Sequence, residues 1–150
     1  MTPPEITVFD HYGIESGMLE KLQAFSEKAI DGVLRLPAGS LPSQLIAMAE
    51  VEVSLVSDAA IGAAHQEFMS IAGATDVITF QHGELLVSVD TAERQAAEYG
   101  QATERELALY IAHGLLHLHG HDDHVPGEAK TMELLQENLV MENWENGETS

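Results

Sequence analysis

The stretch TERELALYIAHGLLHLHGHDDH, residues 103–124, combines a long apolar helix pattern with five of the chain's eight histidines. Its first four residues, Thr103-Glu-Arg-Glu106, match a capping box, in which threonine and glutamate satisfy free amides of the first helical turn. Apolar residues then occupy most of the circumference as far as Gly120. Because a helix that is apolar nearly all round must be buried, we predict that this helix lies at the centre of the fold.

Two histidines of this helix are spaced for a shared metal ion. His113 and His117 are four residues apart and therefore share one helix face. Gly120 allows a sharp turn that can bring a later residue back over them, and either Asp123 or His124 can supply a third ligand. Three protein ligands and an open position are typical of a catalytic zinc site, so we predict one Zn²⁺ ion here.

Two simpler interpretations compete with the metal site. The pair could be packed core histidines, or part of a surface histidine tract that binds metals adventitiously. The regular spacing of Leu115, Leu116 and Leu118 speaks against a surface tract. The residue after His113 is Gly114, where a zinc protease of the H-E-x-x-H type has its general base, so the usual protease mechanism is disfavoured.

The remaining chain alternates between short strand patterns and helix patterns. Period-two alternation and turn signals predict four strands and a hairpin turn at 81–83. Apolar spacing, with Asp90 or Thr91 as the cap of the third helix, predicts five helices. The predicted strands are 6–9, 51–57, 76–80 and 84–89, and the predicted helices are 16–34, 58–70, 90–99, 103–120 and 127–143. We therefore predict an α+β fold with a small mixed sheet of about four strands packed with about five helices.

The bulk composition limits the classes of protein and partner. A chain of 150 residues predicts one domain, 1–150, and the absence of cysteine excludes disulfides and thiolate metal sites. No apolar stretch is long enough for a membrane span and the N-terminus lacks a secretory pattern, which together favour the cytoplasm. The net charge of −19 argues against a polyanionic partner and counts against a nucleic-acid substrate.

Three segments resemble one known family. His113-Gly-Leu-Leu-His117-Leu-His-Gly120-His-Asp resembles the H-G-x-L-H-L-x-G-Y-D-H signature of the YbeY endoribonucleases. Thr75-Asp-Val-Ile-Thr-Phe80 is similar to the T-D-V-L-S-F segment of that family, and Gly83-Glu-Leu to its G-D-I. The resemblance runs in order from about residue 50 to 135, and more loosely over the whole chain.

The resemblance implies a zinc-dependent, single-strand-specific endoribonuclease with a zincin-like α+β fold and the metal site on its central long helix. Such enzymes take part in 3′-end maturation of small-subunit ribosomal RNA and in ribosome quality control, so single-stranded rRNA and small-subunit components are the implied partners. The implied metal ligands are His113, His117 and a third residue. The ungapped match places Asp123 at that third position, and a one-residue shift places His124 there. No catalytic residue is assigned beyond the metal and its water.

The resemblance also directs attention to substrate contacts. His65 falls where the family often has asparagine, and either a substrate contact or a structural role is open to it. Arg94, one of three arginines, is a candidate phosphate contact, with an ordinary helical ion pair to Asp90 or Glu98 as the alternative. Many members carry an arginine where this chain has Met69.

These departures leave two alternative functions open. The missing arginine and the acidity motivate a ribosome-associated zinc-binding module without strong nuclease activity. A metallopeptidase-like hydrolase is the other alternative, with Gly114 as the feature against it.

Overall fold

A four-stranded mixed sheet forms the middle layer of the computed structural model, which describes residues 3–145. The strand order is β1-β2-β4-β3, with β1, β2 and β4 parallel and β3 antiparallel to β4. The outermost residues of the predicted domain, 1–2 and 146–150, lie outside the described part. The strands are β1 (Glu5–Asp10), β2 (Glu50–Val56), β3 (Val77–Phe80) and β4 (Glu84–Ser88).

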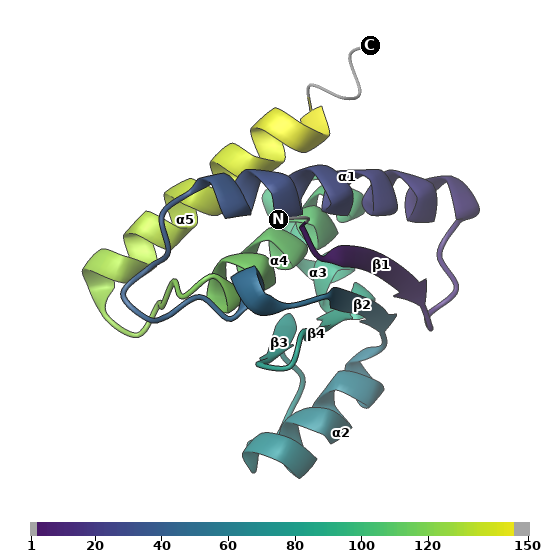
Figure 1. The fold of residues 1–150 in the computed structure, drawn as a ribbon. Helices are drawn as coiled ribbons and strands as arrows, with labels where there is room; N and C mark the ends of the chain where they lie inside the picture. Colours follow the sequence, from purple (N-terminus) through teal and green to yellow (C-terminus); the bar gives the residue numbers. More distant parts are fainter. Residues whose placement is uncertain (1–2, 146–150) are drawn as a thin grey trace.

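Five α-helices surround this sheet in the described part of the chain. Helices α1 and α4 contact each other and the sheet, and α2 packs on the opposite side against β3 and β4 (Figure 1). The helices are α1 (Ser16–Arg35), α2 (Asp58–Met69), α3 (Val89–Tyr99), α4 (Thr103–Leu118) and α5 (Pro126–Val140). A 3₁₀ turn (Leu45–Ala47) precedes β2, and a π-helical turn (Met141–Glu145) follows α5. This architecture confirms the predicted α+β class.

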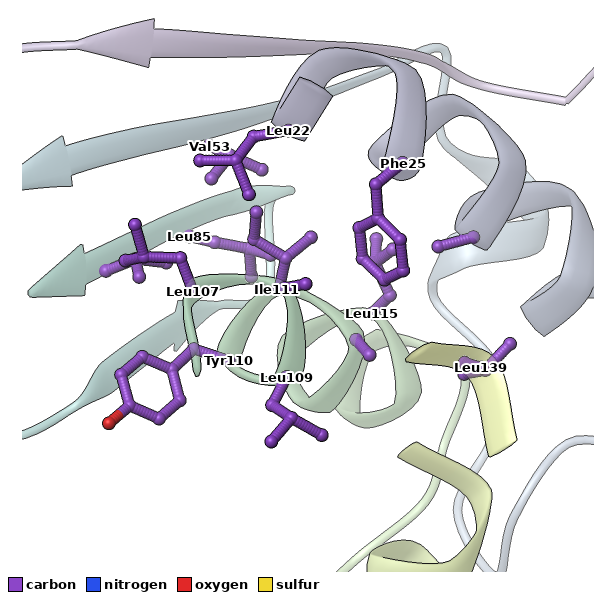
Figure 2. Close-up of a cluster of buried hydrophobic side chains, with 14 of the residues drawn as sticks. Leu22, Phe25, Val53, Leu85, Leu107, Leu109, Tyr110, Ile111, Leu115 and Leu139 are labelled. Atoms are coloured by element: carbon purple, nitrogen blue, oxygen red, sulfur yellow. The ribbon is translucent and has the colours of Figure 1, made fainter. Parts of the chain in front are cut away.

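Helix α4 is the centre of the molecule, as its sequence predicts. Eleven of its sixteen residues are buried. Figure 2 shows Leu22 from α1, Val53 from β2 and Leu85 from β4 gathered around one side of α4. Because a buried leucine contributes roughly 1.5–3 kcal/mol when removed from water, this helix anchors most of the core.

The first turn of α4 differs from the predicted capping box. Thr103 is already inside the helix, the N-cap is Ala102, and no side chain caps it. The physical reason lies in Glu106, which is only 9% exposed and packs inward instead of turning back to the N-cap. Burial raises the pKa of Glu106, so this carboxyl is held toward its neutral form.

The start of α3 also differs from the prediction. Its N-cap is Ser88, whose Oγ accepts a hydrogen bond of 3.1 Å from the amide of Thr91. Strand β4 runs directly into α3, so the last strand residue takes the capping role. Asp90 instead accepts a 2.8 Å hydrogen bond from the amide of Asp58 and another from the Tyr12 hydroxyl.

Among the described helices, none is long and apolar enough to cross a membrane.

Candidate metal centre

Helix α4 and the turn that follows it bring three donor groups together. The Nε2 atoms of His113 and His117 are 3.0 Å apart. Gly120 has φ +89°, and the chain after it reverses so that Asp123 faces the two rings. Its Oδ2 lies 3.6 Å from Nε2 of His113, and its Oδ1 lies 3.7 Å from Nε2 of His117. The predicted turn at Gly120 is therefore confirmed.

The spacing and chemistry of these donors fit a metal ion. Tetrahedral ligands about 2.0–2.2 Å from zinc lie roughly 3.3–3.6 Å from each other, which is close to the three distances observed. Together His113, His117 and Asp123 form a group that could hold one ion. The two imidazoles are about a quarter exposed and the carboxylate slightly more, so the group is reachable from solvent.

Neighbouring residues prepare both rings for coordination. The Nδ1–H group of His113 donates a 2.9 Å hydrogen bond to Oε1 of Gln136 on α5, which leaves its Nε2 lone pair directed at the centre. Burial and the adjacent His113 ring lower the pKa of His117. Because only a neutral imidazole can bind a metal, both effects favour ligation.

The second candidate for the third ligand is engaged by another residue. The His124 side chain is 82% exposed, and its Nδ1 is hydrogen-bonded to Asp122. That bond raises the pKa of His124 and lowers the pKa of Asp122. His124 belongs with Asp122 and Asp123 to a second, more exposed group. The geometry thus brings Asp123, rather than His124, to the two helical histidines.

A pocket of about 300 Å³ opens beside the three donors. His65 and Met69 of α2 line it, and the Nδ1 of His65 is 3.0 Å from the Gly73 carbonyl oxygen. The other lining residues come from β3 and the segment before it, the hairpin turn, and α4 with the loop after it: Thr75, Val77, Ile78, Thr79, Gln81, His113, His117, Asp123 and His124. None of these lining residues is a lysine or an arginine.

Gly114 explains how α4 can lie so close to the sheet. A Cβ atom at this position would come within 2.8 Å of both methyl groups of Leu85, which is fully buried in β4. The position that carries the protease base in H-E-x-x-H helices therefore faces a packed strand. A glutamate there would have to displace the core.

Arg94 does not reach this pocket. Its Nη1 lies 2.6 Å from Oδ2 of Asp58, and its Nη2 donates a 3.0 Å hydrogen bond to Thr91. The predicted helical pair with Asp90 or Glu98 is thus replaced by a contact between α3 and α2. Arg94, with Ser88 and Thr91, lowers the pKa of Asp58 to about 2. The structure therefore shows a structural contact for Arg94, and its role as a phosphate contact stays a prediction.

We expect Asp58→Asn to destabilise the fold by about 1 kcal/mol at neutral pH. The pKa of Asp58 is lower in the folded protein than its ordinary value of 3.8, so its contribution is complete above that value. It is lost as the pH falls toward about 2. The Tm difference between wild type and variant should therefore shrink between pH 5 and about pH 2 in calorimetry. Asp31→Asn, on the exposed side of α1, is the control, and an equal effect of both variants would contradict this explanation.

Sequence reasoning missed the residues that orient the donors. Gln136 is twenty-three positions from His113 and belongs to no motif, so only the packing of α5 on α4 reveals its role. Asp122 lies within the histidine run, but its bond to His124 depends on the loop conformation. Thr79 and Gln81 flank Phe80, and strand alternation could have suggested that they share a face.

Comparisons with known proteins agree with these features. The family model described as Endoribonuclease YbeY matches residues 19–143. Endoribonuclease YbeY of Myxococcus xanthus is 43% identical over 106 residues, which cover 62% of this chain and 36% of that protein. The Moorella thermoacetica protein of the same name is 34% identical over 124 residues, covering 70% of this chain and 80% of the relative. The chain thus spans little more than a third of the first relative and most of the second.

A solved structure extends the likeness to the whole fold. The solution structure of TM1509 from Thermotoga maritima matches with a TM-score of 0.66 and 28% sequence identity. The match covers 96% of this chain and 92% of that protein. It supports the zincin-like α+β class predicted from the sequence. Since the family model spans strands β2 to β4 and the donor-bearing helix, the chain belongs to the YbeY endoribonuclease family.

Proposed function

We propose that this protein is a zinc-dependent endoribonuclease that cleaves single-stranded RNA, with His113, His117 and Asp123 as the metal ligands. The observation that carries the proposal is the convergence of these three donors beside an open pocket, in a member of the YbeY family. A zinc ion bound there would supply an activated water and would stabilise negative charge on a phosphoryl oxygen.

Other side chains around the pocket would orient the ligands and contact the substrate. Gln136 holds the His113 ring in the orientation and tautomer that expose Nε2. His65, Thr79 and Gln81 offer polar groups around the pocket, and His65 remains our candidate for a substrate contact. Met69 lines the pocket at the position where many family members have arginine. This chain therefore lacks a cation at that position to assist RNA cleavage.

The family membership supports a more specific role. We propose that the substrate is ribosomal RNA, that the protein acts in 3′-end maturation of small-subunit rRNA and in ribosome quality control, and that it works in the cytoplasm as one domain, 1–150. The strong negative charge makes association with basic small-subunit components favourable, although it opposes direct contact with RNA phosphates.

The direct test is cleavage of single-stranded and duplex ribosomal RNA fragments by purified protein. We expect cutting of the single-stranded fragment only, loss of cutting on chelation, and recovery when zinc is restored. If chelation lowers the Tm but RNA is never cut, and the protein still co-sediments with ribosomal subunits, the zinc-binding module is the better interpretation. Peptide turnover that is lost on chelation would favour the metallopeptidase.

A pair of variants distinguishes the two candidate third ligands. Asp123→Ala should weaken zinc binding by at least about 100-fold, because removing even an outer-shell partner of a ligand costs 10–100-fold. His124→Ala should change the affinity by less than about threefold, since its ring is bound to Asp122. Titration with a competing zinc indicator measures both constants. The reverse order of effects would assign the third position to His124.

A further inference from the structure

Three neighbouring rings form a row at the β3 edge of the sheet, in which two exposed rings flank the partly buried Phe80. Phe68 of α2 meets Phe80 of β3 edge to face, with ring centroids 5.4 Å apart. His82, in the β3–β4 turn, stacks on Phe80 at 5.6 Å with an interplanar angle of 26°. Phe68 is 64% exposed, and the His82 side chain is 71% exposed. We call Phe68, Phe80 and His82 the aromatic row.

The aromatic row adjoins the pocket at the metal centre through its neighbours in the sequence. Met69, which follows Phe68, lines the pocket. Thr79 and Gln81, on either side of Phe80, line it as well. Strand β3 is an edge strand, so no further strand covers this side of the sheet in the described structure. Because side chains alternate along a strand, Phe80 points to the opposite face of β3 from Thr79 and Gln81. A polymer held at the donor group would therefore reach these rings by passing around the exposed β3 edge.

We propose that the aromatic row is a base-stacking subsite, which binds nucleobases of single-stranded RNA next to the bond held at the metal centre. This inference rests on the proposed function. Base stacking on aromatic side chains is tolerant of sequence, because every base has a π face. A duplex buries those faces between its own base pairs, so a stacking subsite selects single strands.

The charge distribution favours bases over phosphates as the groups recognised here. No lysine or arginine occurs in the sequence between Arg35 and Arg94, a stretch that contains α2, β3 and β4. Arg94 is engaged by Asp58. Binding of single strands through phosphates needs cations, and the segment from α2 to β4 carries none. Stacking supplies affinity without them.

The test uses a short single-stranded oligoribonucleotide containing 2-aminopurine, whose fluorescence is quenched when the base stacks. It is mixed with zinc-loaded protein in a stopped-flow instrument and read before cleavage. We expect Phe68→Leu to abolish the quenching and to weaken binding roughly tenfold, while Phe68→Tyr stays within about threefold of wild type. Leucine keeps an apolar surface but no ring, so it separates stacking from general hydrophobic contact.

The chain offers a matched control at the opposite edge of the sheet. Phe9 is 41% exposed and stacks on His11 at 6.4 Å with the same interplanar angle of 26°. Phe9→Leu should leave quenching and affinity unchanged. Binding by wild type should also depend weakly on salt, with a log–log slope no steeper than about −1.4, the value for roughly two phosphate contacts.

Two results would overturn the inference. One is unchanged RNA binding by Phe68→Leu, which is also the outcome if the row is a docking surface for a protein. The other is a steep salt dependence without quenching. If RNA is still cleaved when either result is obtained, the stacking subsite is contradicted but the proposed nuclease function is not. Quenching that depends on Phe68, without any cleavage, would support the row and contradict the proposed nuclease.

Discussion

His117→Ala should abolish zinc binding and lower RNA cleavage by at least about 1,000-fold, which corresponds to roughly 4 kcal/mol of transition-state stabilisation. The reason is geometric. His117 supplies one of three donor atoms, and its Nε2 lies 3.0 Å from Nε2 of His113 and 3.7 Å from Asp123. Two remaining donors would hold a zinc ion less tightly than three, and the activated water that the ion would supply would be lost with it. Single-turnover cleavage of a labelled single-stranded RNA measures the effect.

His11→Ala is the control for this prediction. His11 is an exposed histidine that follows β1, at the sheet edge opposite to β3, and it does not line the pocket. Its replacement should leave zinc affinity and cleavage within about twofold of wild type, as for surface substitutions in general. Equal residual cleavage by wild type and His117→Ala would mean that the observed nuclease does not use this centre.

The central helix could be predicted because the sequence signals that indicate it lie within the helix itself. Residues 107–118 carry their own apolar pattern, and His113 and His117 share a face through helix geometry alone. The strands and the hairpin at 81–83 were predictable for the same reason, since period-two alternation and turn residues are short-range signals. The order β1-β2-β4-β3 is a property of the tertiary packing and could not be obtained in this way.

The parts that escaped prediction depend on contacts between distant elements. Arg94 is near Asp90 and Glu98 in sequence, yet it pairs with Asp58, thirty-six positions away. Glu106 has the spacing of a capping residue, but burial beside the core outweighs the cap. The sequence cannot choose between Asp123 and His124 as the third ligand, because a one-residue shift in a loop leaves no periodic signal. In the structure, His124 is bonded to Asp122, and Asp123 is the residue grouped with the pair.

Gly120→Ala should destabilise the protein by more than about 3 kcal/mol and lower the Tm by roughly 10 °C. Gly120 has φ +89°, a conformation that side chains with a Cβ rarely adopt. An added Cβ would also lie 2.0 Å from the Leu41 carbonyl oxygen and 3.3 Å from the Pro42 oxygen. Both are backbone atoms of the loop before β2, so no side-chain rotation can relieve the clash.

The same clash should disturb the metal centre more than a general loss of stability would. The loop before β2 is tied to the end of α4 by hydrogen bonds from Leu41 N to Gly120 O (3.0 Å) and from Gln44 N to Leu118 O (2.8 Å). Moving that loop moves the turn that carries Asp123. We therefore expect weaker zinc binding by Gly120→Ala even at temperatures where circular dichroism shows the variant to be folded.

Gly17→Ala provides the comparison that isolates backbone conformation. Gly17 lies in the first turn of α1, has no atom within 4 Å of an added Cβ, and has an ordinary helical conformation. Alanine there should be neutral or stabilise the fold by up to about 1 kcal/mol. If Gly120→Ala were equally mild in calorimetry, the tight turn could not be what brings Asp123 to His113 and His117. The donor group would then have to be assembled by the loop contacts alone, and substitutions at Leu41 rather than at Gly120 would control zinc affinity.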